Sequence, residues 1–119
     1  MKITFDQAMQ DKLGQYGEVD FVLDIDHELT DGKSKMAMSC SGISRYRLIV
    51  VDKGVVPDIF DERIDSNLGT VYMKNYGKFY LDEELKIRIE NNVFITLLSD
   101  GAIFSRNVEL VDYRHLVFV

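Results

Sequence analysis

Residues 19–26 of the chain read VDFVLDID. Its apolar side chains recur at positions 19, 21, 23 and 25, and acidic side chains stand at positions 20, 24 and 26. Successive side chains of a β-strand point to opposite faces, so this pattern predicts a strand with one face in a core and the other toward solvent. Val22 is the exception, because it is an apolar residue on the acidic side.

A helix is predicted before this strand, at the N-terminal end. Thr4 and Gln7 have the spacing of a capping box, in which the two residues satisfy free backbone N–H groups of the first turn. Apolar residues then fall at helical spacing, and they are Phe5, Ala8, Met9, Leu13 and Tyr16. Gly14 or Gly17 ends the helix, because glycine readily adopts the left-handed conformation found after helix ends.

The rest of the chain is rich in strand patterns. Further strands are predicted at residues 45–51, 55–60, 70–74, 85–89, 93–98 and 108–111. Asp52-Lys53-Gly54 and Asn91-Asn92 have the composition of hairpin turns. We therefore expect one domain over residues 1–119 of the α+β class, mainly β, in which the N-terminal helix is followed by a compact sandwich-like or barrel-like β-structure.

Composition and charge exclude several classes of protein. The 119 residues carry a net charge of -6, which repels phosphate backbones, so we expect no nucleic-acid partner. No apolar run reaches the ~20 residues that cross a bilayer, so we expect no membrane association. The first residues lack the apolar core of a secretory signal, which favours a cytoplasmic location. One cysteine excludes an intramolecular disulfide and a four-cysteine zinc site within one chain.

That cysteine lies in the segment Ser39-Cys40-Ser41-Gly42, shortly before the strand predicted at residues 45–51. A lone thiol can be a small packing residue, a redox group or one ligand of a metal site. The serines and the glycine around it favour a loop with some exposure, and Arg45 and Arg47 could favour the thiolate if they point toward the sulfur. The residues alone leave these alternatives open.

The order of elements and the Cys-Ser-Gly triplet resemble the HesB/IscA-type family, the A-type iron-sulfur cluster biogenesis proteins. In that family an N-terminal helix and a strand lead to a Gly-Cys-Ser-Gly segment, which Ser39-Cys40-Ser41-Gly42 resembles. Residues 77–82, GKFYLD, are similar to the family's Gly-Lys-Ser-x-x-x-Leu-Asp stretch. Residues 65–69, DSNLG, resemble a divergent, cysteine-poor branch found in low-GC Gram-positive bacteria. The resemblance covers nearly the whole chain and implies a HesB/IscA-like domain.

The resemblance implies a non-enzymatic function in iron-sulfur cluster biogenesis, as an assembly scaffold or carrier. Cys40 is the residue that matches a family ligand, so it is the predicted cofactor-binding and metal-binding residue. The family's Cys-Gly-Cys tail would fall at residues 102–108, AIFSRNV, which contain no thiol. Clusters normally take four thiolates, so iron or a 2Fe-2S cluster would have to be shared between chains of a homo-oligomer and passed to assembly or recipient proteins.

Two other functions remain open. The chain could be a metal-free module on the same fold that binds a small molecule or a protein and holds no cofactor. It could also be a single-thiol redox sensor that acts through a disulfide between two Cys40 residues, which requires an exposed sulfur of low pKa.

A second candidate metal site is the acidic cluster formed by Asp24, Asp26, His27 and Glu28. Carboxylates at alternate positions share one strand face and could gather a divalent cation. Its spacing does not fit a calcium loop, because leucine and lysine occupy the positions of the required glycine and glutamate. We therefore interpret the cluster as the solvated end of an exposed strand face.

The remaining candidates are interpreted structurally. His115 is expected to be an exposed or edge residue. A group of aromatic residues is expected to pack in the core and at an oligomer face, and its members are Tyr72, Tyr76, Phe79, Tyr80 and Phe94. The motifs of serine hydrolases, nucleotide-binding loops and zinc proteases are missing from the sequence, so we expect no enzymatic activity.

Overall fold

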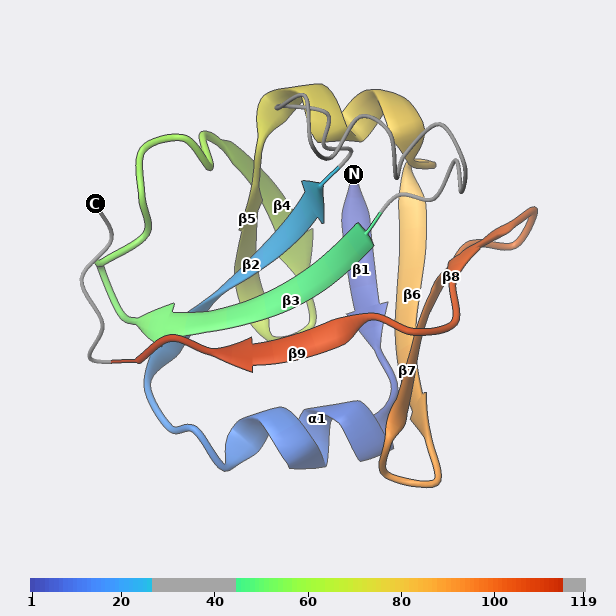
Figure 1. Cartoon of the computed structure of the whole chain (residues 1–119), viewed down its shortest axis with the longest axis horizontal. Helices are drawn as coiled ribbons and strands as arrows, with labels where there is room; N and C mark the ends of the chain where they lie inside the picture. The colour runs from blue at the N-terminus through green and yellow to red at the C-terminus, as the bar shows by residue number, and fades with distance from the viewer. Residues whose placement is uncertain (27–44, 115–119) are drawn as a thin grey trace, which may run out of the picture.

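The computed structural model describes residues 1–26 and 45–114 (Figure 1). They form one short α-helix, α1 (Gln7–Gly14), and one 3-10 helix, η1 (Asn75–Tyr80). The strands are β1 (Lys2–Phe5), β2 (Val19–Asp26), β3 (Arg45–Asp52), β4 (Glu62–Ser66), β5 (Gly69–Met73), β6 (Glu84–Glu90), β7 (Phe94–Leu98), β8 (Ile103–Ser105) and β9 (Glu109–Asp112). No helix among these residues is long and apolar enough to cross a membrane.

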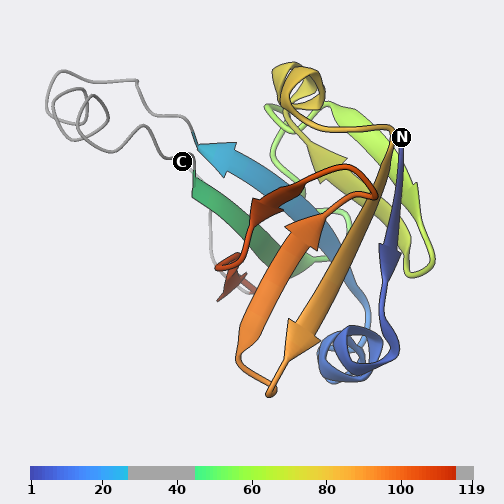
Figure 2. The same ribbon diagram turned by 90° about the vertical axis from the view of Figure 1, so that its right-hand side faces the viewer.

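All nine strands belong to one sheet, in the order β8-β7-β6-β1-β4-β5-β2-β3-β9. The sheet curls into a half-barrel, as Figure 2 shows. Its two edges, β8 and β9, are separated in sequence only by residues 106–108. Within that link the backbone N–H of Val108 donates to the carbonyl oxygen of Ile95 in β7 at 2.9 Å, while β9 pairs with β3. The chain therefore steps directly from one edge to the other, which requires a strongly curled sheet.

The prediction of an N-terminal helix is wrong, because the first element is strand β1. Ile3 and Phe5 are buried, while Lys2 and Thr4, which alternate with them, are exposed. This alternation suits a strand, and β1 lies between β4 and β6 with parallel pairing to both. The helix begins only after Asp6, whose Oδ1 accepts the N–H of Met9 at 2.8 Å. The fold is thus mainly β, as expected, but it is one curled sheet that starts with a strand.

Several strand predictions are confirmed. Residues 19–26 pair antiparallel with residues 45–52 over their full lengths, and residues 84–90 pair with residues 94–98. The turn between the latter two contains Asn91 and Asn92 at φ 53° and 59°, as expected for a tight hairpin.

The strand predicted at residues 55–60 is wrong. This segment is an irregular loop, in which Val55 and Ile59 are 47% and 60% exposed. The next strand, β4, was missed because its sequence ERIDS buries only Ile64. The β-propensity of the apolar residues 55–60 favoured a strand there, whereas backbone pairing with β1 and β5 makes the polar residues 62–66 the strand.

The core fills the inside of the curled sheet, and α1 closes one end of it with Met9 and Leu13. A second, smaller cluster lies on the outer face, where Val22, Ile49, Val51 and Phe60 pack together. This cluster explains the apolar exception in the first strand pattern. Val22 is buried because the loop that contains Phe60 covers this part of the outer face.

Candidate functional site

Cys40, the predicted ligand, lies outside the described residues, as do His27, Glu28 and His115. The structure does describe the two strands that hold the ends of residues 27–44. Strand β2 ends at Asp26 and β3 begins at Arg45, and these two residues are paired with each other. The residues that flank this segment therefore lie side by side as one cross-strand pair.

A charged cluster lies next to this pair, on the outer face of the sheet. Asp24 is at its centre, with a side chain only 4% exposed. Its Oδ2 accepts a hydrogen bond from Arg47 at 2.7 Å, and its Oδ1 lies 3.3 Å from Nζ of Lys74. Arg47 stands opposite Asp24 in the β2–β3 register, and Lys74 directly follows β5. The cluster thus joins three neighbouring strands.

The interpretation of Asp24 as part of a solvated strand face is therefore wrong. Both Asp24 and Asp20 are buried, and the connection between β3 and β4 folds over this face at Asp20 and Val22. Asp20 accepts the backbone N–H of Gly54 from that connection at 2.9 Å. Each carboxylate is also close to a cation, as buried charges require, with Lys53 at 3.8 Å from Asp20.

Two polar atoms of the cluster, one acceptor and one donor, are buried without a hydrogen-bond partner among the described residues. They are Oδ1 of Asp24 and Nε of Arg47. Lys74 is within ion-pair distance of the first atom, but not in hydrogen-bond geometry. Its ammonium also lies 5.8 Å from the ring centroid of Phe60. Two cations thus approach the one carboxylate of Asp24.

Tyr46 is the buried neighbour of this cluster on the inner face of β3. It pairs with Ile25 and is 8% exposed. Burial raises the pKa of its phenol above the ordinary value of 10.0, because the charged form loses its hydration.

The 3-10 helix η1 begins directly after Lys74 and packs on the same end of the sheet (Figure 1). A Cβ atom at Gly77 would lie 2.8 Å from Cε of Met73 and 3.1 Å from Cδ1 of Ile25. Glycine leaves room there for the ends of these two buried side chains, and an added Cβ would force the Met73 methyl group to shift. The Gly-Lys stretch that carried part of the family resemblance thus has a packing role.

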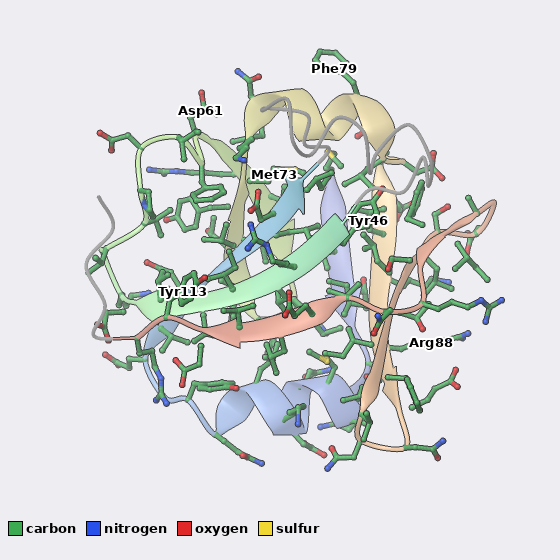
Figure 3. All side chains as sticks on the ribbon, in the orientation of Figure 1. Tyr46, Asp61, Met73, Phe79, Arg88 and Tyr113 are labelled. Carbon is green, nitrogen blue, oxygen red and sulfur yellow. The ribbon has the colours of Figure 1, made fainter. Side chains whose placement is uncertain are left out.

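The aromatic residues do not all lie in the core, and their predicted place at an oligomer face stays a prediction. Phe79 points away from the sheet on η1 and is 77% exposed, and Phe94 is also exposed (Figure 3). Tyr72 is half-buried beside the outer cluster. The side chains of Tyr76 and Tyr80 lie outside the described part of the structure.

The sequence interpretation missed the role of Arg47 with Lys74, and also that of Asn67. Asn67 lies at the end of β4, where its Oδ1 accepts the N–H of Phe5 at 2.9 Å and its Nδ2 donates to the Phe5 carbonyl at 3.0 Å. Its side chain thereby extends the β1–β4 pairing by one position. The available signal for Arg47 was strand alternation, which places it on the same outer face as Asp24.

Residues 1–26 and 45–114 contain no group of three or more His, Cys, Asp or Glu side chains that could hold a metal ion. The buried carboxylate of Asp24 is already engaged by two cations. The second predicted metal site is therefore not supported by its described members.

Comparison with known proteins identifies one family and two similar structures. The sequence pattern of a family described as iron-sulphur cluster biosynthesis matches residues 1–112. One similar crystal structure is that of a protein from Lactobacillus salivarius, named as a candidate Fe-S biosynthesis protein with a novel protein fold. Its sequence is 30% identical to this chain, and the TM-score is 0.77. The match covers 97% of this chain and 100% of that one.

A second crystal structure, of a candidate Fe-S biosynthesis protein from Lactobacillus acidophilus, is 18% identical with a TM-score of 0.66. The match covers 94% of this chain and 90% of that one, and at this identity it shows the shared fold alone. No curated protein matches the sequence.

Proposed function

Since the chain belongs to the iron-sulphur cluster biosynthesis family, we propose that it assembles or carries iron-sulfur clusters without catalysing a reaction, using Cys40 as its thiolate ligand. The observation that carries this proposal is the family match over residues 1–112, which includes the single cysteine. The similar structure from L. salivarius, matched over nearly the whole of both chains, supports the same conclusion.

The number of sulfur donors determines how a cluster can be held. Each chain has one thiol, and a cluster normally takes four thiolates, so two chains supply half of the ligands. We therefore propose that iron or a 2Fe-2S cluster is bound between the Cys40 residues of two chains. Water, glutathione or oxygen and nitrogen side chains complete the coordination. Each thiol gives up its proton when its sulfur binds iron.

Such a site suits a transient carrier better than a permanent one. Ligands other than thiolate bind a soft cluster less tightly, so the cluster can pass to a recipient with more cysteines. In this proposal the cluster is cargo, and the protein supplies an attachment point.

Anaerobic reconstitution with iron and sulfide tests the proposal. Wild type, Cys40→Ser and Ser41→Ala are treated identically, and iron and labile sulfide are counted per chain after gel filtration. We expect visible absorption and about one cluster per two chains for wild type and Ser41→Ala, because each chain supplies one thiolate. Cys40→Ser is expected to bind neither iron nor sulfide.

Equal loading of wild type and Cys40→Ser would rule out the thiol as ligand. Absence of loading in all three variants would refute cluster binding by this protein. Circular dichroism of each apo-protein verifies that the variants remain folded. A covalent dimer formed by wild type under mild peroxide, without any loading, would support the redox sensor instead.

A further inference from the structure

Strand β8 lies at one edge of the sheet, contains no charged residue, and has opposite charges just beyond its two ends. We propose that β8 is a dimerisation strand, which pairs antiparallel with β8 of a second copy of this chain. The inference goes beyond the proposed function and does not depend on it, because it rests on the residues in and around β8 and not on cluster binding.

The first step is the open edge. β8 is the last strand of the sheet, and within the described residues it pairs with β7 alone. An edge strand presents unpaired backbone N–H and C=O groups, which many proteins protect with charged side chains or proline. Residues 101–105, GAIFS, contain neither. The strand at the other edge, β9, has exposed Glu109 and Asp112 at its two ends. Of the two edge strands, β8 therefore lacks this protection.

The second step is the apolar surface of this edge. Ile103 is 46% exposed, and Phe104 is half-buried at the border of the core. In an antiparallel pair whose twofold axis passes Phe104, the two Phe104 residues stand opposite each other and Ile103 stands opposite Ser105 of the other copy. Side chains opposite each other on paired strands are in contact, and pairs of aromatic residues are favourable there. Pairing would thus remove apolar surface from water.

The third step is the choice of partner. Asp100 precedes β8 in a turn that projects from the sheet at the right of Figure 1, and its side chain is 91% exposed. Arg106 directly follows β8 and is also exposed. Antiparallel pairing places the start of one strand beside the end of the other, so Asp100 of each copy would lie near Arg106 of the other. The surface contact of Asp100 with Lys86 is an exposed ion pair, which contributes little and does not prevent this arrangement.

The same comparison disfavours the other edge. Antiparallel pairing of two β9 strands would bring Glu109 of one copy beside Asp112 of the other, and like charges opposite each other are destabilising. The chain is therefore complementary to itself at β8 and not at β9. β8 has only three residues, so the interface is small. Small interfaces are typical of weak, transient complexes, and we expect a dimer that forms at micromolar to millimolar protein concentrations.

Sedimentation equilibrium of the protein without iron tests the proposal over this concentration range, with a reductant that prevents a disulfide between Cys40 residues. Asp100→Arg and Arg106→Asp each place like charges at both ends of the paired strands, and Asp100→Arg/Arg106→Asp restores opposite charges. Each single substitution changes two contacts of the dimer, so we expect it to raise the dissociation constant about tenfold. The double variant should return the constant to within about threefold of wild type.

Two further variants complete the test. Ile103→Lys places a charge on the edge and should abolish the dimer. Glu18→Arg is the matched control, because Glu18 is exposed in the connection between α1 and β2 and the substitution changes the net charge as Asp100→Arg does. It should dimerise at least as well as wild type. Circular dichroism verifies that every variant is folded.

A wild-type protein that stays monomeric at every concentration overturns the proposal. A folded double variant that dimerises no better than the single variants overturns it too, as does a dimer that none of the β8 substitutions weakens, since that dimer would use another surface. Cluster loading is not measured in this experiment, so its outcome leaves the proposed function to its own test.

Discussion

Removal of the Asn67 side chain tests the account of how β1 is held in the sheet. In Asn67→Ala the N–H of Phe5 loses its acceptor, while the Phe5 carbonyl keeps the donor Nε2 of Gln10 at 3.0 Å. Phe5 is almost fully buried, so its N–H finds no simple replacement. An orphaned buried donor costs ~1–3 kcal/mol, and we expect the free energy of unfolding to fall by about 2 kcal/mol. For a chain of this length that corresponds to a melting temperature lowered by about 8 °C.

The assay is urea unfolding followed by circular dichroism, since the chain has no tryptophan for fluorescence. Asn67→Asp keeps an acceptor for Phe5 and should lose about half as much stability. Asn107→Ala is the matched control, because the hydrogen bond of Asn107 to Ser105 uses the backbone N–H and survives the substitution. Equal midpoints for Asn67→Ala and Asn107→Ala would refute the reasoning, as would a greater loss in Asn67→Asp than in Asn67→Ala.

Three further predictions concern other positions. Gly77→Ala should lower the free energy of unfolding by about 1–2 kcal/mol in urea titrations, because the new Cβ would lie 2.8 Å from Cε of Met73. Gly14→Ala is the control, since its Cβ would meet no atom within 4 Å and should leave the free energy of unfolding unchanged. Because the pKa of the Tyr46 phenol is raised in the folded protein, the unfolded chain loses the phenol proton at a lower pH than the folded chain. The free energy of unfolding should therefore fall as the pH rises above about 10, and Tyr46→Phe should reduce that fall. Urea midpoints of the two proteins that change in parallel from about pH 8 to 11 would contradict this prediction. Asn92→Val should lower the free energy of unfolding by about 1–2 kcal/mol, since a φ of 59° at this position disfavours β-branched residues. Asn92→Gly should leave it unchanged or raise it slightly. Equal thermal midpoints for the two variants would count against a strained turn.

The periodicity of apolar residues predicted the long paired strands β2, β3, β6 and β7 well, since each of them places apolar side chains in the core. It failed at the first strand. Residues 2–5 have the same alternation over only four positions, and the capping-box spacing of Thr4 and Gln7 outweighed it. The partners that make β1 a strand lie more than 60 residues away, at residues 65–66 and 84–87, and local patterns cannot reveal them.

The candidate site was predictable only in part. Alternation placed Asp24 on the outer face, but a pattern of that kind does not say whether an outer face is covered. The loop that carries Phe60 covers it, and this loop was predicted as a strand. The family resemblance came from short motifs, and Gly77 in one of them now has a steric reason. The role of Cys40 stays a prediction.

The central position of β1 has a consequence for synthesis on the ribosome. Strand β1 pairs with two strands that are encoded more than 60 residues later, so both of its edges are occupied only after residue 87 has left the exit tunnel. The far edge waits longer, because β9 reaches its partner β3 only when residue 112 has emerged. The edges of β1 and β3 therefore stay unpaired until these later strands emerge, and we expect slow, late cooperative folding.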